Sequence, residues 1–263
     1  MSDAASNVLE AKGLTLVFGA VTAFSDVDFH VGEGELFAVI GPNGAGKTSL
    51  FNVISRVYRP TRGSIRYRDE DLLRRRRSDM PGLGIARTFQ NLGLFHNMTV
   101  LDNVLVGRHH LMRSGSLLGG IYAGYARREE REHRRAAMDV LGFAGVEEWA
   151  GYPVQVLPYG IQKRVELARA LAMEPRVLLL DEPVAGMSSA ERGEITQLVR
   201  RIHQERGMTI VLVEHDMGMV MQVAQRVMVL DFGRVIGVGT PAEVQRDPQV
   251  IRAYLGEALE DAS

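Results

Sequence analysis

The sequence predicts an α/β fold, because strand-like and helix-like patterns alternate along most of its 263 residues. The strand-like segments are continuous runs of Val, Ile and Leu, which is typical of strands covered on both faces of a parallel sheet. A glycine-rich loop joins one such run to a helical pattern, as in a strand–loop–helix unit. Strands are expected at Val8–Leu16, Ala23–Val31, Leu36–Ile40, Val177–Leu180, Thr209–Val213 and Arg226–Leu230.

The glycine-rich loop reads GPNGAGKT at residues 41–48 and indicates a phosphate-binding P-loop. Glycines let backbone N–H groups turn toward one anion, because they adopt conformations that a Cβ excludes. Lys47 would reach the β- and γ-phosphates, and the Thr48 hydroxyl would bind Mg²⁺. The motif predicts a nucleotide, but alone it fits a kinase, a GTPase or a transport ATPase. The residues expected to bind it are Gly41, Pro42, Asn43, Gly44, Ala45, Gly46, Lys47, Thr48 and Ser49.

Composition limits the function classes. A formal net charge of −1 provides no general field that would attract nucleic acid, and the absence of cysteine excludes disulfides and cysteine-ligated zinc. No apolar run approaches the ~20 residues that a membrane-spanning helix needs, and the first residues lack the pattern of a signal peptide. We therefore expect a cytoplasmic chain that takes any membrane role through a partner.

The middle of the chain differs from its flanks. Strand patterns nearly vanish there, while Thr99–Gly107 and Arg127–Leu141 have helical patterns. A helical subdomain is therefore expected to interrupt the α/β core. The expected segments are a single domain at 7–256, with its core at 7–90 and 161–240, the helical subdomain at 91–160 and a C-terminal helical tail at 241–263.

Two basic clusters have a structural and a functional interpretation. Arg74–Arg77 follows three acidic residues and is expected to form a solvated surface helix, with phosphate or lipid-headgroup binding as the alternative. The Arg residues at 127–135 alternate with Glu, so pairing within the helix is expected.

Two carboxylates follow the buried run Val177–Leu180. The carboxyl ends of strands in a doubly wound sheet face the ligand crevice. Asp181 is expected to hold Mg²⁺ beside Thr48, and Glu182 to act as general base on an attacking water. The structural alternative is a strand followed by an ordinary Asp-Glu-Pro turn.

Two further polar residues are candidates for the same site. His215 ends the run Thr209–Val213, where it would contact the γ-phosphate, although a lone histidine is more often structural. Gln90 follows the short apolar segment at 85–89, and its amide would reach Mg²⁺ or the attacking water. Glu182, His215 and Gln90 are thus the expected catalytic residues.

The order of GPNGAGKT, Gln90, LPYGIQ at 157–162, LLLDEP at 178–183 and His215 resembles that of ATP-binding-cassette (ABC) ATPases over nearly the whole chain. The resemblance implies a P-loop NTPase (RecA-like) core with an antiparallel β subdomain and an inserted α-helical subdomain. It also implies that two ATPase subunits sandwich two ATP molecules head to tail, and that Phe18 stacks on adenine, unless Phe18 is an ordinary core or edge-strand residue. The partners implied are a second ATPase subunit, transmembrane permease subunits and, indirectly, a substrate-binding protein, with the chain peripheral on the inner face of the cell membrane.

The segment LPYGIQKRVELARAL and the tail from Gly239 to Gly256 resemble LivG-type ATPases of branched-chain amino acid importers. The alternatives left open are a related importer for urea, amides or aromatic acids, a lipid or lipopolysaccharide exporter, and a non-transport ABC ATPase acting on nucleic acid or the ribosome. The last alternative is disfavoured, because the sequence has neither an excess of basic residues nor a second cassette.

The signature segment departs from the family's LSGGQ. Pro158 replaces its Ser, Tyr159 its first Gly and Ile161 its Gln, while Gly160 stands, and Ser188 replaces an expected Asp. The segment is still expected to face the partner's ATP, through Pro158, Tyr159, Gly160, Ile161 and Gln162. We expect a non-identical partner and two unequal ATP sites; the alternative is a tolerated substitution with symmetric hydrolysis.

Overall fold

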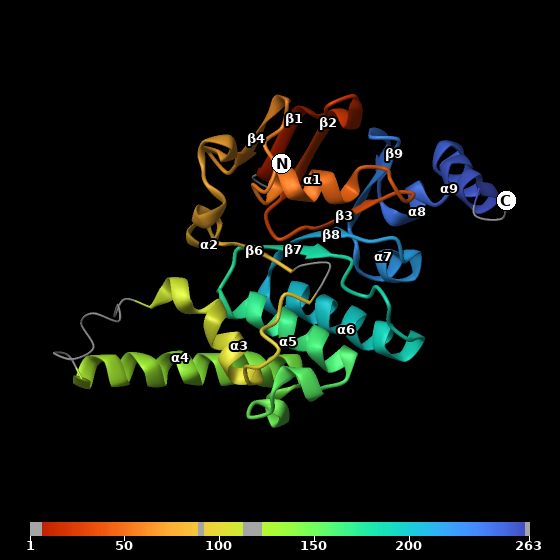
Figure 1. Ribbon diagram of the computed structural model, residues 1–263. Helices are drawn as coiled ribbons and strands as arrows, with labels where there is room; N and C mark the ends of the chain where they lie inside the picture. The colour runs from red at the N-terminus through yellow and green to blue at the C-terminus, as the bar shows by residue number, and fades with distance from the viewer. Residues whose placement is uncertain (1–6, 89–91, 113–122, 261–263) are drawn as a thin grey trace, which may run out of the picture.

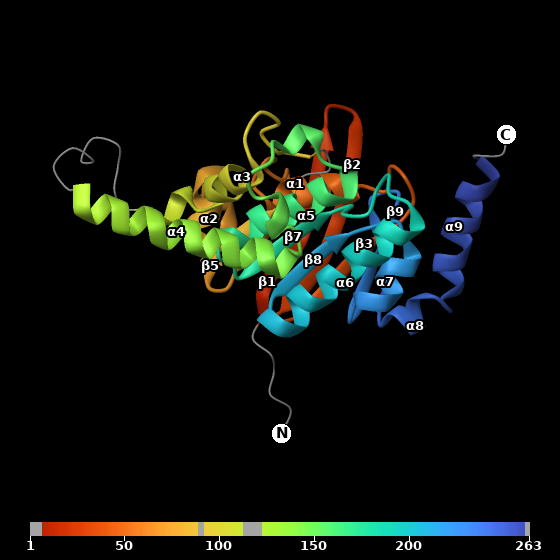
Figure 2. The same cartoon turned by 90° about the horizontal axis from the view of Figure 1, so that it is seen from below.

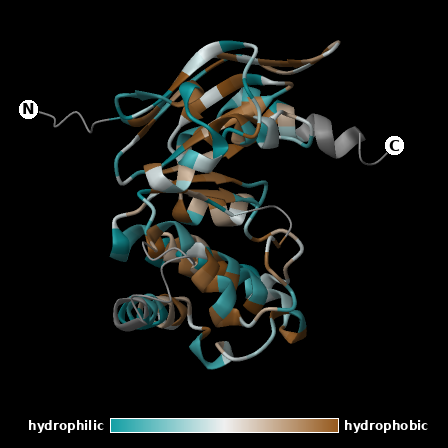
Figure 3. Ribbon diagram, turned by 60° about the vertical axis from the view of Figure 1, so that its left-hand side comes forward, coloured by the Kyte–Doolittle hydropathy of each residue, from teal (hydrophilic) through white to brown (hydrophobic). Residues whose placement is uncertain are grey.

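The structure is a computed structural model that describes residues 7–88, 92–112 and 123–260. Two sheets and two groups of helices form layers, with α1 (Lys47–Ile54) between the sheets and the larger helices on the far side of the central sheet (Figure 1). Figure 2 shows the same layers from below, and Figure 3 shows that the strands of the central sheet are mostly apolar.

The central sheet is six-stranded, with the order β10-β9-β3-β8-β7-β6. The five strands from β9 to β6 pair in parallel, so the carboxyl ends of these strands meet at one edge of the sheet. Strand β10 is antiparallel to β9. All five residues of β3, β7 and β8 are buried, which explains why these strands read as continuous apolar runs. The bounds are β3 Leu36–Ile40, β6 Ile85–Arg87, β7 Val177–Asp181, β8 Thr209–Val213, β9 Arg226–Asp231 and β10 Arg234–Gly239.

The second sheet is antiparallel, with the order β2-β1-β4-β5, and confirms the expected β subdomain. Its inner face packs on α1 and on one face of the central sheet, to which Phe37 and Val39 of β3 contribute. Strand β4 was not predicted, because only Ile65 and Tyr67 of its six residues are buried. The bounds are β1 Asn7–Phe18, β2 Val21–Gly32, β4 Arg62–Tyr67 and β5 Glu70–Asp71.

Helices cover the other face of the central sheet. The predicted amphipathic helix is present as α4, and its Arg128 Nε donates to Glu132 at 2.9 Å, as expected for pairing within the helix. None of the helices in the described part of the chain is long and apolar enough to cross a membrane. The bounds are α2 Met80–Leu83, α3 Val100–Gly107, α4 Ala123–Ala144, α5 Tyr159–Ala172, α6 Ser189–Arg206, α7 Met217–Val223, α8 Pro241–Val244 and α9 Pro248–Glu260.

The basic cluster Arg74–Arg77 does not form the expected surface helix. Two 3-10 turns, Leu72–Arg74 and Arg77–Asp79, flank an extended pair at Arg75 and Arg76. The prediction of a continuous helix was wrong because the Arg76 amide donates to Asp79 Oδ2 at 2.8 Å instead of to a helical carbonyl, and this bond begins a second turn. Arg74 pairs with Asp71 at 3.3 Å and Arg75 with Glu70, so these two side chains form exposed ion pairs.

Candidate functional site

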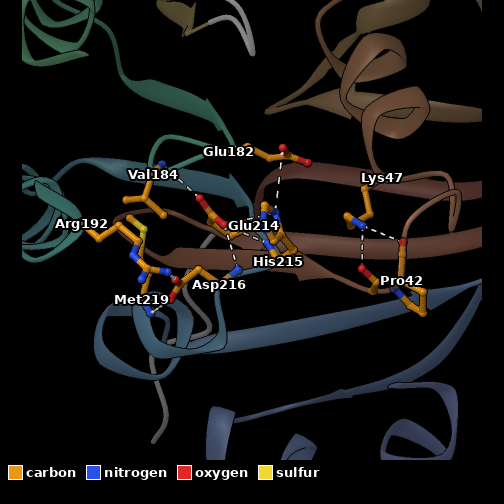
Figure 4. Close-up of polar contacts among 10 residues, drawn as sticks. Pro42, Lys47, Glu182, Val184, Arg192, Glu214, His215, Asp216 and Met219 are labelled. Carbon is orange, nitrogen blue, oxygen red and sulfur yellow. Dashed lines mark hydrogen bonds and ion pairs between the residues drawn. The ribbon is translucent and has the colours of Figure 1, made fainter. Parts of the chain in front are cut away.

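The P-loop connects β3 to α1 and depends on its glycines. Gly46 has φ +97° immediately before α1, and a Cβ on Gly41 would lie 1.9 Å from the Leu230 carbonyl oxygen. The Lys47 side chain is buried and turns back over the loop, where Nζ donates to the carbonyls of Gly41 at 2.6 Å and Pro42 at 2.7 Å (Figure 4). No acidic residue lies in the first turn of α1, so the positive end of the helix remains available to an anion.

The carboxyl ends of β7 and β8 bring two of the predicted catalytic side chains together. Glu182 follows β7 at φ +45°, an uncommon conformation for a residue with a side chain, and its amide donates to Val213 O at 2.9 Å. His215 follows β8, and its Nδ1 lies 3.9 Å from Glu182 Oε2 (Figure 4). The His215 side chain is half exposed, which leaves it accessible to a bound phosphate.

Glu214 organises this region and was missed by the sequence analysis. It is fully buried and accepts three backbone N–H bonds, from Val184 at 3.2 Å and from His215 and Asp216 at 2.9 Å each (Figure 4). Burial raises the pKa of its carboxyl, and the backbone bonds oppose that effect. A charged residue at the end of an apolar strand was the signal that could have identified it.

Asp181 is held by a residue that the sequence analysis did not single out. Arg87, at the end of β6, places Nη2 2.6 Å from Asp181 Oδ2. Its Nη1 donates to Asn52 on α1 at 2.8 Å and to Ser55, the residue after α1, at 2.5 Å. Burial raises the pKa of the Asp181 carboxyl, and the bond to Arg87 lowers it. The guanidinium therefore ties the carboxylate at the end of β7 to the helix that follows the P-loop.

The donor set fits a magnesium ion. Asp181 Oδ1 is buried and makes no hydrogen bond among the described residues, although the other oxygen is fully engaged by Arg87. Magnesium prefers carboxylate and hydroxyl oxygens and accepts few protein ligands beside phosphate and water. Asp181 and the Thr48 hydroxyl supply such oxygens. Gln90, the third expected ligand and a predicted catalytic residue, lies outside the described residues.

Phe18 ends β1 at the turn into β2, and its side chain is 46% exposed. Its ring contacts Tyr58 edge to face, with centroids 5.1 Å apart and planes at 76°. Tyr58 therefore covers only part of the Phe18 ring, and the exposed part remains open to stacking by a base.

The signature segment begins α5, on the opposite side of the central sheet from α1 (Figure 1). Pro158 precedes the helix without a side-chain cap, and the Tyr159 hydroxyl donates to Ala185 O at 3.3 Å. Gln162 turns inward to donate to Leu157 O at 2.8 Å, and Ile161 packs against the core. Gly160 lies beside Glu191, which forms a capping box with Ser188 at the start of α6. The structure therefore separates Pro158–Gln162 from the P-loop of the same chain.

Comparison with known protein families shows to which family a chain with these motifs belongs. Residues 24–185 match the family model described as "ABC transporter". The chain belongs to this family of ATP-binding cassettes. Residues 234–260, which include α9, also match the model described as "Branched-chain amino acid ATP-binding cassette transporter". The chain is 38% identical to LivG of Escherichia coli (strain K12), the high-affinity branched-chain amino acid transport ATP-binding protein, over 95% of this chain and 98% of LivG.

Two solved cassettes have the same fold. The ADP conformation of MJ1267, an ATP-binding cassette of an ABC transporter, is 28% identical, with a TM-score of 0.82 over 95% of this chain and 99% of MJ1267. The dimeric post-hydrolysis state of the cassette MJ0796, bound to ADP and Pi, is 27% identical, with a TM-score of 0.74 over 89% of this chain and 98% of MJ0796. ABC cassettes of this kind bind ATP and dimerise.

Proposed function

We propose that this cassette hydrolyses ATP to drive an importer of branched-chain amino acids. The observation that carries the proposal is the pairing of Glu182 with His215, at the ends of adjacent strands, on the strand edge that also bears the P-loop. The substrate class rests on the 38% identity to LivG and on the match of the C-terminal segment. The site geometry thus supports ATP hydrolysis, and the similarity to LivG separately supports the class of transported substrate.

In this proposal each side chain at the strand ends near the P-loop has a separate role in ATP binding or hydrolysis. Lys47 exchanges the carbonyls of Gly41 and Pro42 for the β- and γ-phosphates of ATP, because a phosphate is the stronger partner for an ammonium group. Glu182 accepts the proton of the attacking water, and His215 donates a hydrogen bond to the γ-phosphate. Phe18 stacks on adenine, which contributes about 1–3 kcal/mol in comparable base-stacking contacts.

Mg²⁺ would be held by Thr48, Asp181 and Gln90, and when bound it would neutralise charge on the β- and γ-phosphates. Arg87 keeps one oxygen of Asp181 engaged, so the carboxylate presents its other oxygen in a fixed direction. Orientation of this oxygen is the contribution that the protein makes to the metal site.

The transport partners are also proposed. A permease segment would dock in a cavity of about 580 Å³ between the core and the helical layer, whose wall includes Arg87, Phe95, Val106 and Arg169. A second, non-identical ATPase subunit would complete the ATP site with its signature segment, and a binding protein would deliver the substrate to the permease. The chain would then lie on the inner face of the cell membrane, and nucleic acid would play no part.

The altered signature supports two unequal ATP sites. Where this chain supplies the signature, Pro158 provides no hydroxyl for the partner's nucleotide, which removes a bond of about 1.5–3 kcal/mol if charge-assisted. The site that uses this chain's Lys47, Glu182 and His215 would then hydrolyse ATP faster. Disabling the general base of each subunit in turn, in the reconstituted transporter, tests this: equal losses of ATPase activity would contradict it.

The general test uses the purified chain together with its transporter. Glu182→Gln should lower ATP turnover by about 10²–10⁴-fold while ATP still binds, because only the base is lost. Lys47→Ala should weaken ATP binding itself. Glu205→Gln on the exposed side of α6 is the matched control and should leave both unchanged. Uptake of labelled leucine into vesicles, against urea and an aromatic acid, tests the substrate class. Normal turnover by Glu182→Gln would overturn the proposed mechanism.

A further inference from the structure

The turn between β9 and β10 exposes an aromatic side chain in an unfavourable backbone conformation. Strand β9 ends at Asp231, which pairs with Arg234 at the start of β10, so Phe232 and Gly233 form a two-residue hairpin turn. Phe232 has φ +41° and Gly233 φ +73°. Such turns favour Asn or Gly at both positions, because a left-handed residue with a bulky side chain is strained.

Phe232 gains no burial in return for this conformation. Its side chain is 86% exposed, the most exposed large hydrophobic residue among those the structure describes. An aromatic ring held in water at a strained position stabilises neither the turn nor the core of the isolated chain. Observed strain of this kind points to a contact that forms outside the chain.

The turn is fixed against the P-loop. The Gly233 amide donates to Ala45 O at 3.1 Å, and the Ser25 amide donates to Gly233 O at 2.9 Å. A Cβ on Gly233 would lie 2.7 Å from Ala23 O, so the backbone of the turn is in close contact with β2. Phe232 therefore keeps a constant position relative to the phosphate-binding loop.

A cavity joins Phe232 to the P-loop and to the C-terminal helix. It has a volume of about 670 Å³, and its wall includes Asn43 and Gly44 of the P-loop, Phe232, and Gln249 and Arg252 of α9. In both Figure 1 and Figure 2, α9 stands on the side of the central sheet where the P-loop lies. The rim made by Phe232 and α9 is thus continuous with Asn43 and Gly44 of the P-loop, which the second subunit would face in the proposed function.

We propose that Phe232 and the facing side of α9 form a docking surface for the second ATPase subunit, outside the composite ATP site. The inference rests on the proposed function, because it requires a pair of ATPase subunits. A segment of the second subunit that reaches Asn43 and Gly44 enters the same cavity and contacts Phe232. The ring offers an apolar contact and Arg252 a cation, so the segment that fits carries an apolar side chain with an acidic group or a carbonyl nearby.

The test separates the stability of the chain from the pairing of subunits. The full chain carries Glu182→Gln, so that bound ATP persists, and sedimentation velocity measures ATP-dependent pairing with itself and with the second ATPase subunit of the transporter. Phe232→Asn removes the ring but suits a left-handed turn position. Phe232→Tyr keeps the ring. Arg68→Asn is the matched control, since Arg68 has φ +51° in the two-residue turn between β4 and β5.

Phe232→Asn is expected to melt at the same temperature as the parent or higher, to bind ATP normally, and to pair about 10- to 100-fold more weakly, as expected for loss of a buried aromatic contact. Phe232→Tyr and Arg68→Asn should pair like the parent. Equal pairing by Phe232→Asn would overturn the inference and leave the proposed function intact.

Two other results would also overturn it. A lower melting temperature for Phe232→Asn would show that the ring supports the fold, and loss of ATP binding would place the ring on the nucleotide. A parent chain that binds ATP but pairs with neither subunit would refute the two-subunit ATPase, and this inference with it.

Discussion

Replacing Arg87 by Ala should destabilise the chain far more than an exposed ion pair would suggest. The Arg87 side chain is 11% exposed and that of Asp181 only 1%. Removing one member of a buried pair costs about 3–5 kcal/mol, because the remaining charge has no compensating partner. The bonds from Arg87 to Asn52 and Ser55 are lost as well, at about 1 kcal/mol each. Since such terms do not add fully, we expect a total loss of about 4 kcal/mol.

Urea unfolding measures this loss, with the fluorescence of the single tryptophan, Trp149, as the signal. The control is Arg128→Ala, which breaks the exposed Arg128–Glu132 pair at 2.9 Å and should cost less than about 1 kcal/mol. The double variant Arg87→Ala with Asp181→Asn should lose less than the sum of the two single variants, because no unpaired charge remains. A loss below about 1 kcal/mol for Arg87→Ala would refute the reasoning.

Three further predictions concern neighbouring groups. Glu214→Ala leaves three backbone amides without their acceptor and should cost about 3 kcal/mol in urea unfolding, whereas the exposed capping residue Glu243→Ala should cost clearly less. Burial raises the pKa of the Glu214 carboxyl above its usual 4.5. The contribution of this pKa shift to the free energy of unfolding is therefore largest below pH 4.5 and is lost as the pH rises through the folded-state pKa. The unfolding free energy of the wild type, relative to Glu214→Gln, should therefore fall as pH rises from 4.5; a rise would contradict this sign. Gly41→Ala places a Cβ 1.9 Å from the Leu230 carbonyl and should abolish ATP binding in a calorimetric titration, while Gly44→Ala, with no atom within 4 Å, should retain more of it.

Buried strands were predictable from the sequence, whereas strands that are very short or mostly exposed were not. The runs at β3, β7 and β8 are apolar at every position because both faces of the central sheet are covered. Strand β4 has most of its residues exposed, and β6 has only three residues. For such strands pairing with a neighbour, rather than composition, determines the structure.

The candidate site was predictable where a residue type follows a motif. The P-loop follows β3, Asp181 ends β7 with Glu182 next to it, and His215 lies two residues after β8. Parallel pairing brings these strand ends to one edge. Arg87 and Glu214 were not predicted, because the contacts from Arg87 to Asp181 and from Glu214 to Val184 span 94 and 30 residues of the chain. Their roles depend on contacts that no local pattern encodes.

These contacts also connect the parts of the cassette that the proposed function requires to act together. Glu214 binds the amides of His215 and of Val184, so the segment after β7 cannot shift without disturbing His215. The Tyr159 hydroxyl binds Ala185 O, one residue after Val184, which extends the connection to the start of α5. A glycine at the position of Tyr159 would lack this bond. Tyr159 therefore ties the start of α5 to the segment after β7, and Glu214 ties that segment to His215.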